Sequence, residues 1–404
     1  MRSANRLTTI GMVAVMALVS TVTTVAFANA ELDSAMNNFK SGKFLEAAAE
    51  FQSMVDQSPS YDFGFYMMGL SFLKMSKVDE AEKNLMKAIE LNGDKFEYHH
   101  ALSNAYFEGK AYPKAIAILK TAEPLAGDER TQYALHQLRG MSYAALEKWS
   151  DAIDDLEKAK AVKSTGAVLD RLALAYYSLG HYDKAIPALQ KALKASPNNV
   201  PMLARLTSAQ LNMGAETKDD ARKKSYYDAA LATAEKYRSV KPNSADANNL
   251  CGRAALGGQQ FDKAEQAFRK VLAIKSNHCY AMANLGKTFI ATQRWSDAEA
   301  ILNDAVTCAP RMAVVYEGLG FVLQKQKRLP EAIATYQKAL QIKPSAGIEN
   351  AIETCRTNIE VGEHNVKMDL LAQQQKEEER IAQEEYEREK AKQEEWKKKR
   401  EQGD

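Results

Sequence analysis

The stretch from Gly252 to Leu302 reads GRAALGGQQFDKAEQAFRKVLAIKSNHCYAMANLGKTFIATQRWSDAEAIL and contains one pattern twice. Phe261-Asp-Lys-Ala264 is followed 34 residues later by Trp295-Ser-Asp-Ala298, so in both an aromatic residue stands three places before an alanine. A small residue also stands twelve places before each alanine, and a bulky residue stands four places after it. A pattern that recurs with such a period predicts one supersecondary unit that is repeated along the chain.

The same three columns of residues extend over most of the sequence. The alanines are Ala47, Ala81, Ala115, Ala152, Ala185, Ala230, Ala264, Ala298 and Ala332, and their gaps are 34, 34, 37, 33, 45, 34, 34 and 34 residues. The small column holds Ala35, Gly69, Ser103, Gly140, Ala173, Gly252, Gly286 and Gly320, and in the sixth repeat Thr207 takes this place after allowing for an insertion. The bulky column, four residues after each alanine, holds Phe51, Leu85, Leu119, Leu156, Leu189, Phe268, Leu302 and Tyr336, with Ala234 in the sixth repeat as its small member. We expect paired helices in which the small column faces the alanines at the closest approach, with bulky side chains filling the volume around it.

Composition agrees with a helical chain. The 404 residues include only 20 Gly and 10 Pro, too few for the many turns of an all-β protein. The 54 basic and 52 acidic residues leave a formal charge of +2, which gives no reason to expect a nucleic-acid binder. Four Cys and six His are too few and too scattered for a disulfide scaffold or a Cys/His zinc site.

Residues 1–30 have the features of a secretory signal peptide. Arg2 and Arg6 precede an apolar stretch, and the small residues of Ala28-Asn-Ala30 predict cleavage after Ala30. The alternative is an uncleaved membrane anchor, which the threonines of the tract and its small-residue exit disfavour. We therefore expect a soluble periplasmic or secreted protein without a membrane span, and its formal charge is zero once the two arginines are removed.

The repeat resembles that of the tetratricopeptide repeat family, whose unit is a 34-residue helix–turn–helix with this Gly, aromatic, Ala and Pro spacing. The resemblance implies an all-α, right-handed α-solenoid of about nine helix hairpins over residues 31–346. Residues 347–368 are expected to form a capping helix over the last exposed apolar face. Residues 369–404 are expected to form a charged, solvated helical tail, or a docking arm that uses Tyr386 and Trp396. The extra residues 215–225 predict a second helix that starts about three turns early in the sixth unit.

The resemblance also implies a function, which is to bind a protein or an extended peptide along a concave groove lined by the first helices. The candidate groove residues form a polar set, whose side chains can donate hydrogen bonds to a carboxylate, and an aromatic set. The polar set is Arg171, Arg205, Asn249, Arg253, Asn284 and Lys287, and the aromatic set is Phe63, Tyr66 and His100. The alternatives are a solvated surface for the polar set and packing between first helices for the aromatic set. A rival function is an architectural role in an outer-membrane, secretion or polysaccharide-export assembly, through the outer face and the tail.

No motif in the sequence carries catalytic chemistry, so we expect no enzymatic activity, cofactor or metal. Gly-rich phosphate loops, G-x-S-x-G and H-E-x-x-H are absent from the sequence. Cys279 opens the eighth unit and Cys308 closes it, and these two ends of an antiparallel hairpin lie at the same level. Export would allow a disulfide between them. Cys251 and Cys355 are expected to be buried thiols.

Overall fold

The structure is a computed structural model that describes residues 30–401. Every regular element in that range is a helix, as the sequence predicted. The predicted signal peptide lies outside the described residues, apart from Ala30. The chain divides into two compact units, one up to Glu216 and one from Thr217 on, and each is described by itself. Between residues 30 and 401 no helix is both long enough and apolar enough to cross a bilayer.

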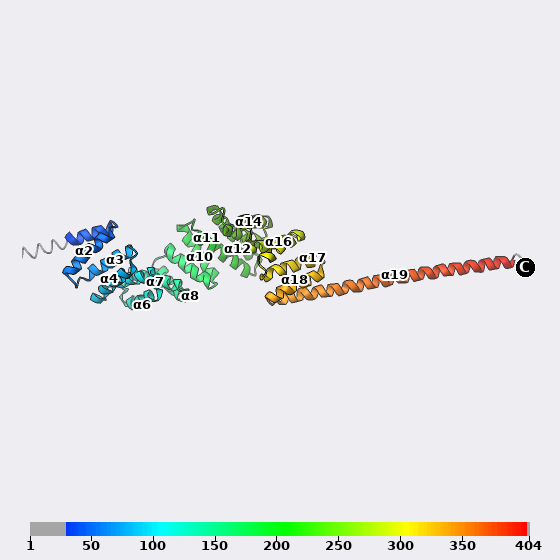
Figure 1. Ribbon diagram of the computed structural model, residues 1–404, viewed down its shortest axis with the longest axis horizontal. Coiled ribbons are helices and arrows are strands. Elements are labelled where there is room, and N and C mark those ends of the chain that lie inside the picture. Colours follow the sequence, from blue (N-terminus) through cyan, green and yellow to red (C-terminus); the bar gives the residue numbers. More distant parts are fainter. Residues whose placement is uncertain (1–29, 402–404) are drawn as a thin grey trace, which may run out of the picture. The chain divides into compact units, whose positions relative to one another are not determined.

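The first unit consists of successive helix pairs (Figure 1). It begins with a helix over residues 30–40. The elements that follow are α2 (Phe44–Gln57), α3 (Asp62–Lys74), α4 (Val78–Leu91), α5 (Phe96–Glu108), α6 (Tyr112–Ala122), the 3-10 helix η1 (Glu123–Leu125), α7 (Glu129–Ala145), α8 (Trp149–Val162), α9 (Gly166–Ser178), α10 (Tyr182–Ala195) and α11 (Val200–Glu216). Helices α3, α5, α7 and α9 each pack on the second helix that follows them, and each also contacts the next first helix, up to α11.

The second unit continues the same pairing and ends in a long helix. Its elements are α12 (Asp220–Val240), α13 (Ala245–Gly257), α14 (Phe261–Ile274), α15 (Cys279–Ala291), α16 (Trp295–Cys308), α17 (Ala313–Lys325), α18 (Leu329–Ile342) and α19 (Ala346–Glu401). Helix α12 begins at Asp220, seven residues before the usual start of a second helix at Tyr227, so it is about two turns longer rather than the expected three, and the remaining extra residues lengthen α11. The N-cap of α12 is Asp219, whose side chain accepts a hydrogen bond from the Arg222 N–H. The division between the units falls inside the sixth repeat, between α11 and α12.

The alanine column marks the centre of each hairpin, because all nine of its side chains are fully buried. The small column, however, faces the bulky column rather than the alanines. A Cβ added to Gly252 would lie 2.6 Å from the Phe268 ring, and one added to Gly286 would lie 2.6 Å from Leu302. Our expectation that the small residues face the alanines was therefore wrong. The glycines leave room for the large side chain that stands four residues after each alanine.

One turn conformation joins the helices of most hairpins. The residue five places before the column alanine has a positive φ in eight repeats: Gly42, Ser76, Lys110, Glu147, Gly180, Gln259, Gln293 and Lys327. The N–H of the following residue bonds to a carbonyl five residues back, for example Arg294 N to Phe289 O at 2.9 Å. This is the Schellman arrangement, in which a left-handed residue ends a helix. Only two of the eight residues are glycine, which is one reason why a chain with so many turns contains few glycines.

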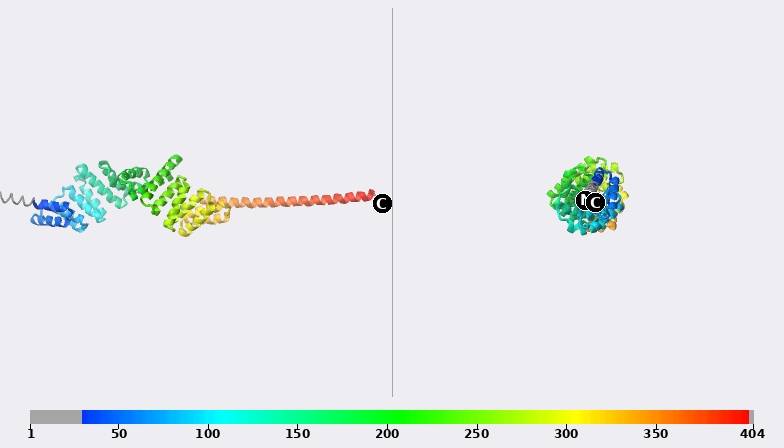
Figure 2. Two further views of the ribbon diagram at one scale, coloured as in Figure 1. Left: turned by 90° about the horizontal axis from the view of Figure 1, so that it is seen from above. Right: turned by 90° about the vertical axis from the view of Figure 1, so that its left-hand side faces the viewer.

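The predicted capping helix and the predicted tail form a single helix, α19. Figure 2 shows it, from orange to red, running on beyond the α17–α18 pair. Its first turns pack on α18 and bury Ile348, Ile352 and Cys355, whereas every residue from 360 to 400 is exposed. Burial of the first apolar stripe is what a solenoid needs at its last repeat.

A disulfide joins Cys279 to Cys308, with their Cα atoms 5.5 Å apart. It links the first residue of α15 to the last residue of α16, the two ends that sequence analysis placed at the same level. Cys251 and Cys355 are free thiols and are buried. Burial raises the pKa of Cys251 to about 11, so this thiol stays protonated and unreactive at neutral pH.

Candidate partner-binding site

A cavity of about 270 Å³ lies on the first helices of the first unit, where α3, α5 and α7 follow one another. It is lined by Tyr66, Leu70, Leu73, Phe96, Glu97, His100, Ala101, Asn104, Arg130, Thr131 and Ala134. The cavity is close to the lower end of the range for ligand pockets, about 300–1,000 Å³. Its apolar lining with a few polar groups suits one or two side chains of a bound peptide.

Two of the three aromatic residues expected at a binding surface line this cavity. Tyr66 comes from α3 and stacks on Tyr98, with ring centroids 4.7 Å apart. His100 comes from α5 and stacks on Phe96, with ring centroids 5.8 Å apart. Both rings are therefore held in place by a second ring, which lowers the entropy that a partner would have to remove on binding.

The third aromatic residue, Phe63, does not line the cavity, although its ring centroid lies 6.0 Å from that of Tyr66. Its ring meets that of Phe51 edge to face, with centroids 6.4 Å apart, and packs against the core between α2 and α3. Phe63 is thus a packing residue, but it packs on the second helix α2 and not between first helices, as the alternative had it. Met67, four residues further along α3, is 4% exposed and also belongs to that core.

The electrostatic character of the cavity is mixed. Burial lowers the pKa of His100 below its ordinary value of 6.5, although the nearby Glu97 opposes the shift, so the ring is neutral at neutral pH. Burial raises the pKa of Tyr66, so its hydroxyl stays protonated. At neutral pH the lining therefore carries one cation, Arg130, and one anion, Glu97.

Arg130 was missed by counting groove positions, and the cause is visible in α7. This helix has 17 residues, whereas α5 has 13, and the extra turn lies at its beginning, where Arg130 stands. The 37-residue gap between Ala115 and Ala152 was the signal in the sequence, because it places Arg130 outside the 34-residue register. Asp128 caps the extra turn by accepting a hydrogen bond from the Thr131 N–H at 2.7 Å.

The polar set of candidates is divided between the two units. Arg171 on α9 and Arg205 on α11 belong to the first unit, and Asn249, Arg253, Asn284 and Lys287 belong to the second. Arg205 already has a carboxylate partner, because its Nη1 lies 2.6 Å from Asp170 Oδ1. Arg171, which directly follows Asp170 in α9, is exposed.

In the second unit the polar candidates have different surroundings. Arg253 is exposed and lies close enough to Tyr227 to oppose the rise in that phenol's pKa caused by burial. Asn249 is half-buried on α13 and its Oδ1 has no hydrogen-bond partner. Asn284 is half-buried on α15, and the Thr288 hydroxyl donates to its backbone carbonyl rather than to its side chain.

Lys287 lines a second cavity, of about 420 Å³, between α15, α17, α18 and the start of α19. Its other lining residues include Glu317, Phe321 and Ile348. In residues 30–400 no group of three or more His, Cys, Asp or Glu side chains is placed to hold a metal ion. Each of these two cavities is therefore mainly apolar and has one basic and one acidic residue in its lining, which suits the recognition of a partner's side chains.

Comparisons with known proteins agree with the repeat pattern. Sequence models of the tetratricopeptide repeat match residues 66–129, 166–199, 219–278, 255–319 and 313–346. The BBSome complex member BBS4 of Bos taurus is 23% identical over 349 residues, which cover 84% of this chain and 62% of that protein. The peroxisomal targeting signal receptor of Candida albicans is 26% identical over 168 residues, which cover 40% of this chain and 26% of that protein. The chain thus spans less than two thirds of the length of these relatives.

A solved structure shares the fold. It is the C-terminal part of a TPR repeat-containing protein from Cytophaga hutchinsonii, with a TM-score of 0.50 and 19% identity. The match covers 63% of this chain and 98% of that one. At this identity the likeness concerns the arrangement of helices and not the chemistry of a site.

Proposed function

Because this chain belongs to the tetratricopeptide repeat family, we propose that it is an exported binding protein that holds an extended segment of a partner protein on its first helices. The observation that carries the proposal is the cavity lined by α3, α5 and α7. Three consecutive repeats contribute to it, so a segment lying across them meets both apolar side chains and polar groups. A binding role also agrees with the names of the relatives, one a receptor and another a member of a complex.

The cavity defines the kind of segment that it would accept. Leu70, Phe96 and Ala134 form part of an apolar lining that favours a bulky apolar or aromatic side chain. Arg130 can donate two parallel hydrogen bonds to a neighbouring carboxylate of the partner. The proposed ligand is therefore an unfolded peptide segment with an apolar anchor followed or preceded by an acidic residue.

Two separate charge-reversal variants compare the cavity with the groove position on α9 that the sequence suggested. Arg130→Glu should abolish capture of the partner from an envelope extract, because it places a second negative charge beside Glu97. Arg171→Glu is the matched control, since it reverses an exposed arginine on the next first helix, α9, and capture should persist. Loss of capture with the control and retention with Arg130→Glu would assign binding to the α9 surface instead.

Photo-crosslinking locates the contact directly. A photoreactive phenylalanine at Tyr66 should crosslink to the partner, and the same group at the exposed Leu45 on α2 should not. Mass spectrometry of the crosslink identifies the bound segment. A peptide of that sequence should then bind the purified protein in a fluorescence titration and compete with the partner.

The architectural role remains the second candidate, and one observation favours it. Residues 360–400 of α19 are all exposed and form a helix that extends beyond the last hairpin. Truncation after Lys376 discriminates between the two functions. Loss of envelope complexes with peptide binding intact supports the architectural role, whereas intact complexes with impaired peptide binding in Arg130→Glu support the binding role.

Export is part of the proposal. The mature protein isolated from the envelope should begin at Glu31, which N-terminal sequencing of the purified chain can check. A mature chain that retains residues 1–30 would support the alternative of an uncleaved anchor.

A further inference from the structure

The exposed part of α19 has charges of opposite sign in two neighbouring stretches. Residues 377–389 include seven acidic and two basic residues, and residues 390–400 include six basic and two acidic residues. Each stretch extends over about three turns of helix. A helix with this distribution is complementary to itself only when a second copy runs in the opposite direction.

One face of the helix carries the complementary residues in a mirrored order. The series Glu378, Ile381, Glu385, Arg388, Lys392, Trp396 and Lys399 advances by three or four residues at each step, which keeps its members on one face. Ile381 is 45% exposed and Trp396 is 63% exposed, so the apolar members have no cover within the chain.

We propose that residues 377–400 of α19 pair antiparallel with the same residues of a second copy, forming a twofold-symmetric dimer centred between Arg388 and Glu389. In this register, the residue number of any position in one copy and that of the position facing it in the other copy add up to 777. Glu378 then faces Lys399, Ile381 faces Trp396, and Glu385 faces Lys392, and the twofold axis repeats each pair. At the centre, Arg388 of each copy faces Glu389 of the other.

Other arrangements of two copies do not match the charges in this way. A parallel pair sets the acidic stretch against itself and the basic stretch against itself, which is destabilising. The ion pairs that α19 makes within itself do not prevent the antiparallel pairing. Lys399 and Glu395, for example, are 2.9 Å apart and both largely exposed, and such i,i+4 pairs contribute about 0.3–0.5 kcal/mol.

The consequence for function is bivalency. A dimer joined through α19 carries two copies of the α3–α5–α7 cavity, so that two linked ligands bind with an effective concentration set by the linker. The dimerisation itself does not depend on the proposed function, because none of the cavity residues takes part in it.

Charge reversal and charge exchange test the register. We expect sedimentation equilibrium of the full processed chain to show a dimer that weakens as salt is raised, because the pairs are exposed. Glu385→Lys alone and Lys392→Glu alone should each shift the chain towards monomer. The double variant Glu385→Lys/Lys392→Glu should restore the dimer, because it exchanges the facing charges. Circular dichroism checks that helix content is unchanged in each variant.

Cysteine crosslinking supplies a second measurement with a matched control. The pair Glu385→Cys/Lys392→Cys should oxidise to a covalent dimer, because the two positions face each other between copies. Positions 386 and 391 also stand at the same level in this register, but they lie outside the paired face, so Tyr386→Cys/Ala391→Cys should not crosslink. A native chain that is monomeric at its highest soluble concentration, a dimer that ignores the single reversals, or a double variant that stays monomeric would each overturn the proposal.

Discussion

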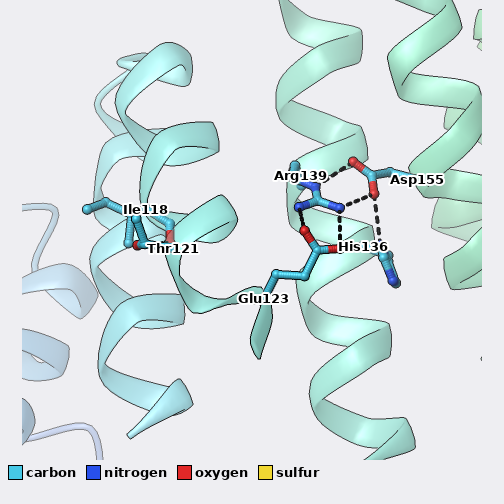
Figure 3. A network of polar contacts seen from close by, with 6 residues as sticks. All are labelled: Ile118, Thr121, Glu123, His136, Arg139 and Asp155. Carbon is cyan, nitrogen blue, oxygen red and sulfur yellow. Dashed lines mark hydrogen bonds and ion pairs between the residues drawn. The ribbon is translucent and has the colours of Figure 1, made fainter. Parts of the chain in front are cut away.

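Asp155 accepts two hydrogen bonds from Arg139 inside the α7–α8 hairpin. Arg139 Nε lies 2.8 Å from Asp155 Oδ2, and Nη2 lies 2.8 Å from Oδ1. Figure 3 shows that Glu123 approaches the guanidinium from the opposite side and that His136 reaches Asp155. Arg139 and Asp155 are only 6% and 4% exposed, so they form a buried ion pair between α7 and α8. Glu123 links η1 to this pair.

Removing one partner of this pair should destabilise the first unit strongly. Asp155→Ala leaves the guanidinium buried with Glu123 alone, and the expected loss is about 3–5 kcal/mol. The double variant Arg139→Met/Asp155→Leu should lose much less, because no charge is left buried without a partner, and the Glu123 side chain, which loses Arg139, is 48% exposed to water. Urea unfolding of both variants checks this, and a double variant as unstable as Asp155→Ala would contradict it.

The close approach at Gly252 should be intolerant of a methyl group. A Cβ there would lie 2.6 Å from the fully buried Phe268 ring. Because this overpacks the hairpin, Gly252→Ala should lower the free energy of unfolding by about 1–3 kcal/mol. Gly318→Ala is the matched control, because its Cβ would lie 3.5 Å from the nearest side chain. The control should leave the free energy of unfolding unchanged or raise it by up to about 1 kcal/mol, because alanine has a higher helix propensity than glycine. Equal losses in thermal unfolding would disprove the packing argument.

The disulfide should stabilise the eighth hairpin. Cys279 and Cys308 are separated by 29 residues, and closing a loop of this length is worth about 3–4 kcal/mol in the chain-entropy model. Reduction should therefore lower the midpoint of unfolding. A thiol assay in denaturant should count two free thiols before reduction, from Cys251 and Cys355, and four after it. Four thiols before reduction in the protein purified from its native compartment would contradict the bridge.

Peptide binding at the α3–α5–α7 cavity should weaken in acid. Burial holds the pKa of His100 below 6.5, and an apolar ligand would bury the ring further. The unfolded chain binds a proton more readily than the folded protein, so stability falls as the pH drops below about 6.5. The free folded protein binds a proton more readily than the complex, so affinity falls as the pH drops through the lowered pKa of the free protein. His100→Gln should remove most of this dependence in titrations at several pH values. An affinity that rises on acidification would contradict the assignment.

The sequence by itself determined the helices, their pairing and the register of the repeats. Each hairpin is made by residues within one 34-residue period, so its alanine column, its turn and its large buried side chain are specified locally. This is why the hairpins and the early start of α12 could be predicted, and why the pairing of Cys279 with Cys308 could be anticipated.

Only the tertiary structure decided which polar and aromatic side chains remain available to a partner. Arg205 is engaged by Asp170, Phe63 is packed against Phe51, and Arg130 reaches the cavity from an extra turn of α7. These outcomes depend on side chains that meet across different helices, 12 to 35 residues apart in the first two cases. A periodic pattern shows which face of a helix a residue occupies, but its contacts are set by the side chain that a neighbouring helix places opposite it.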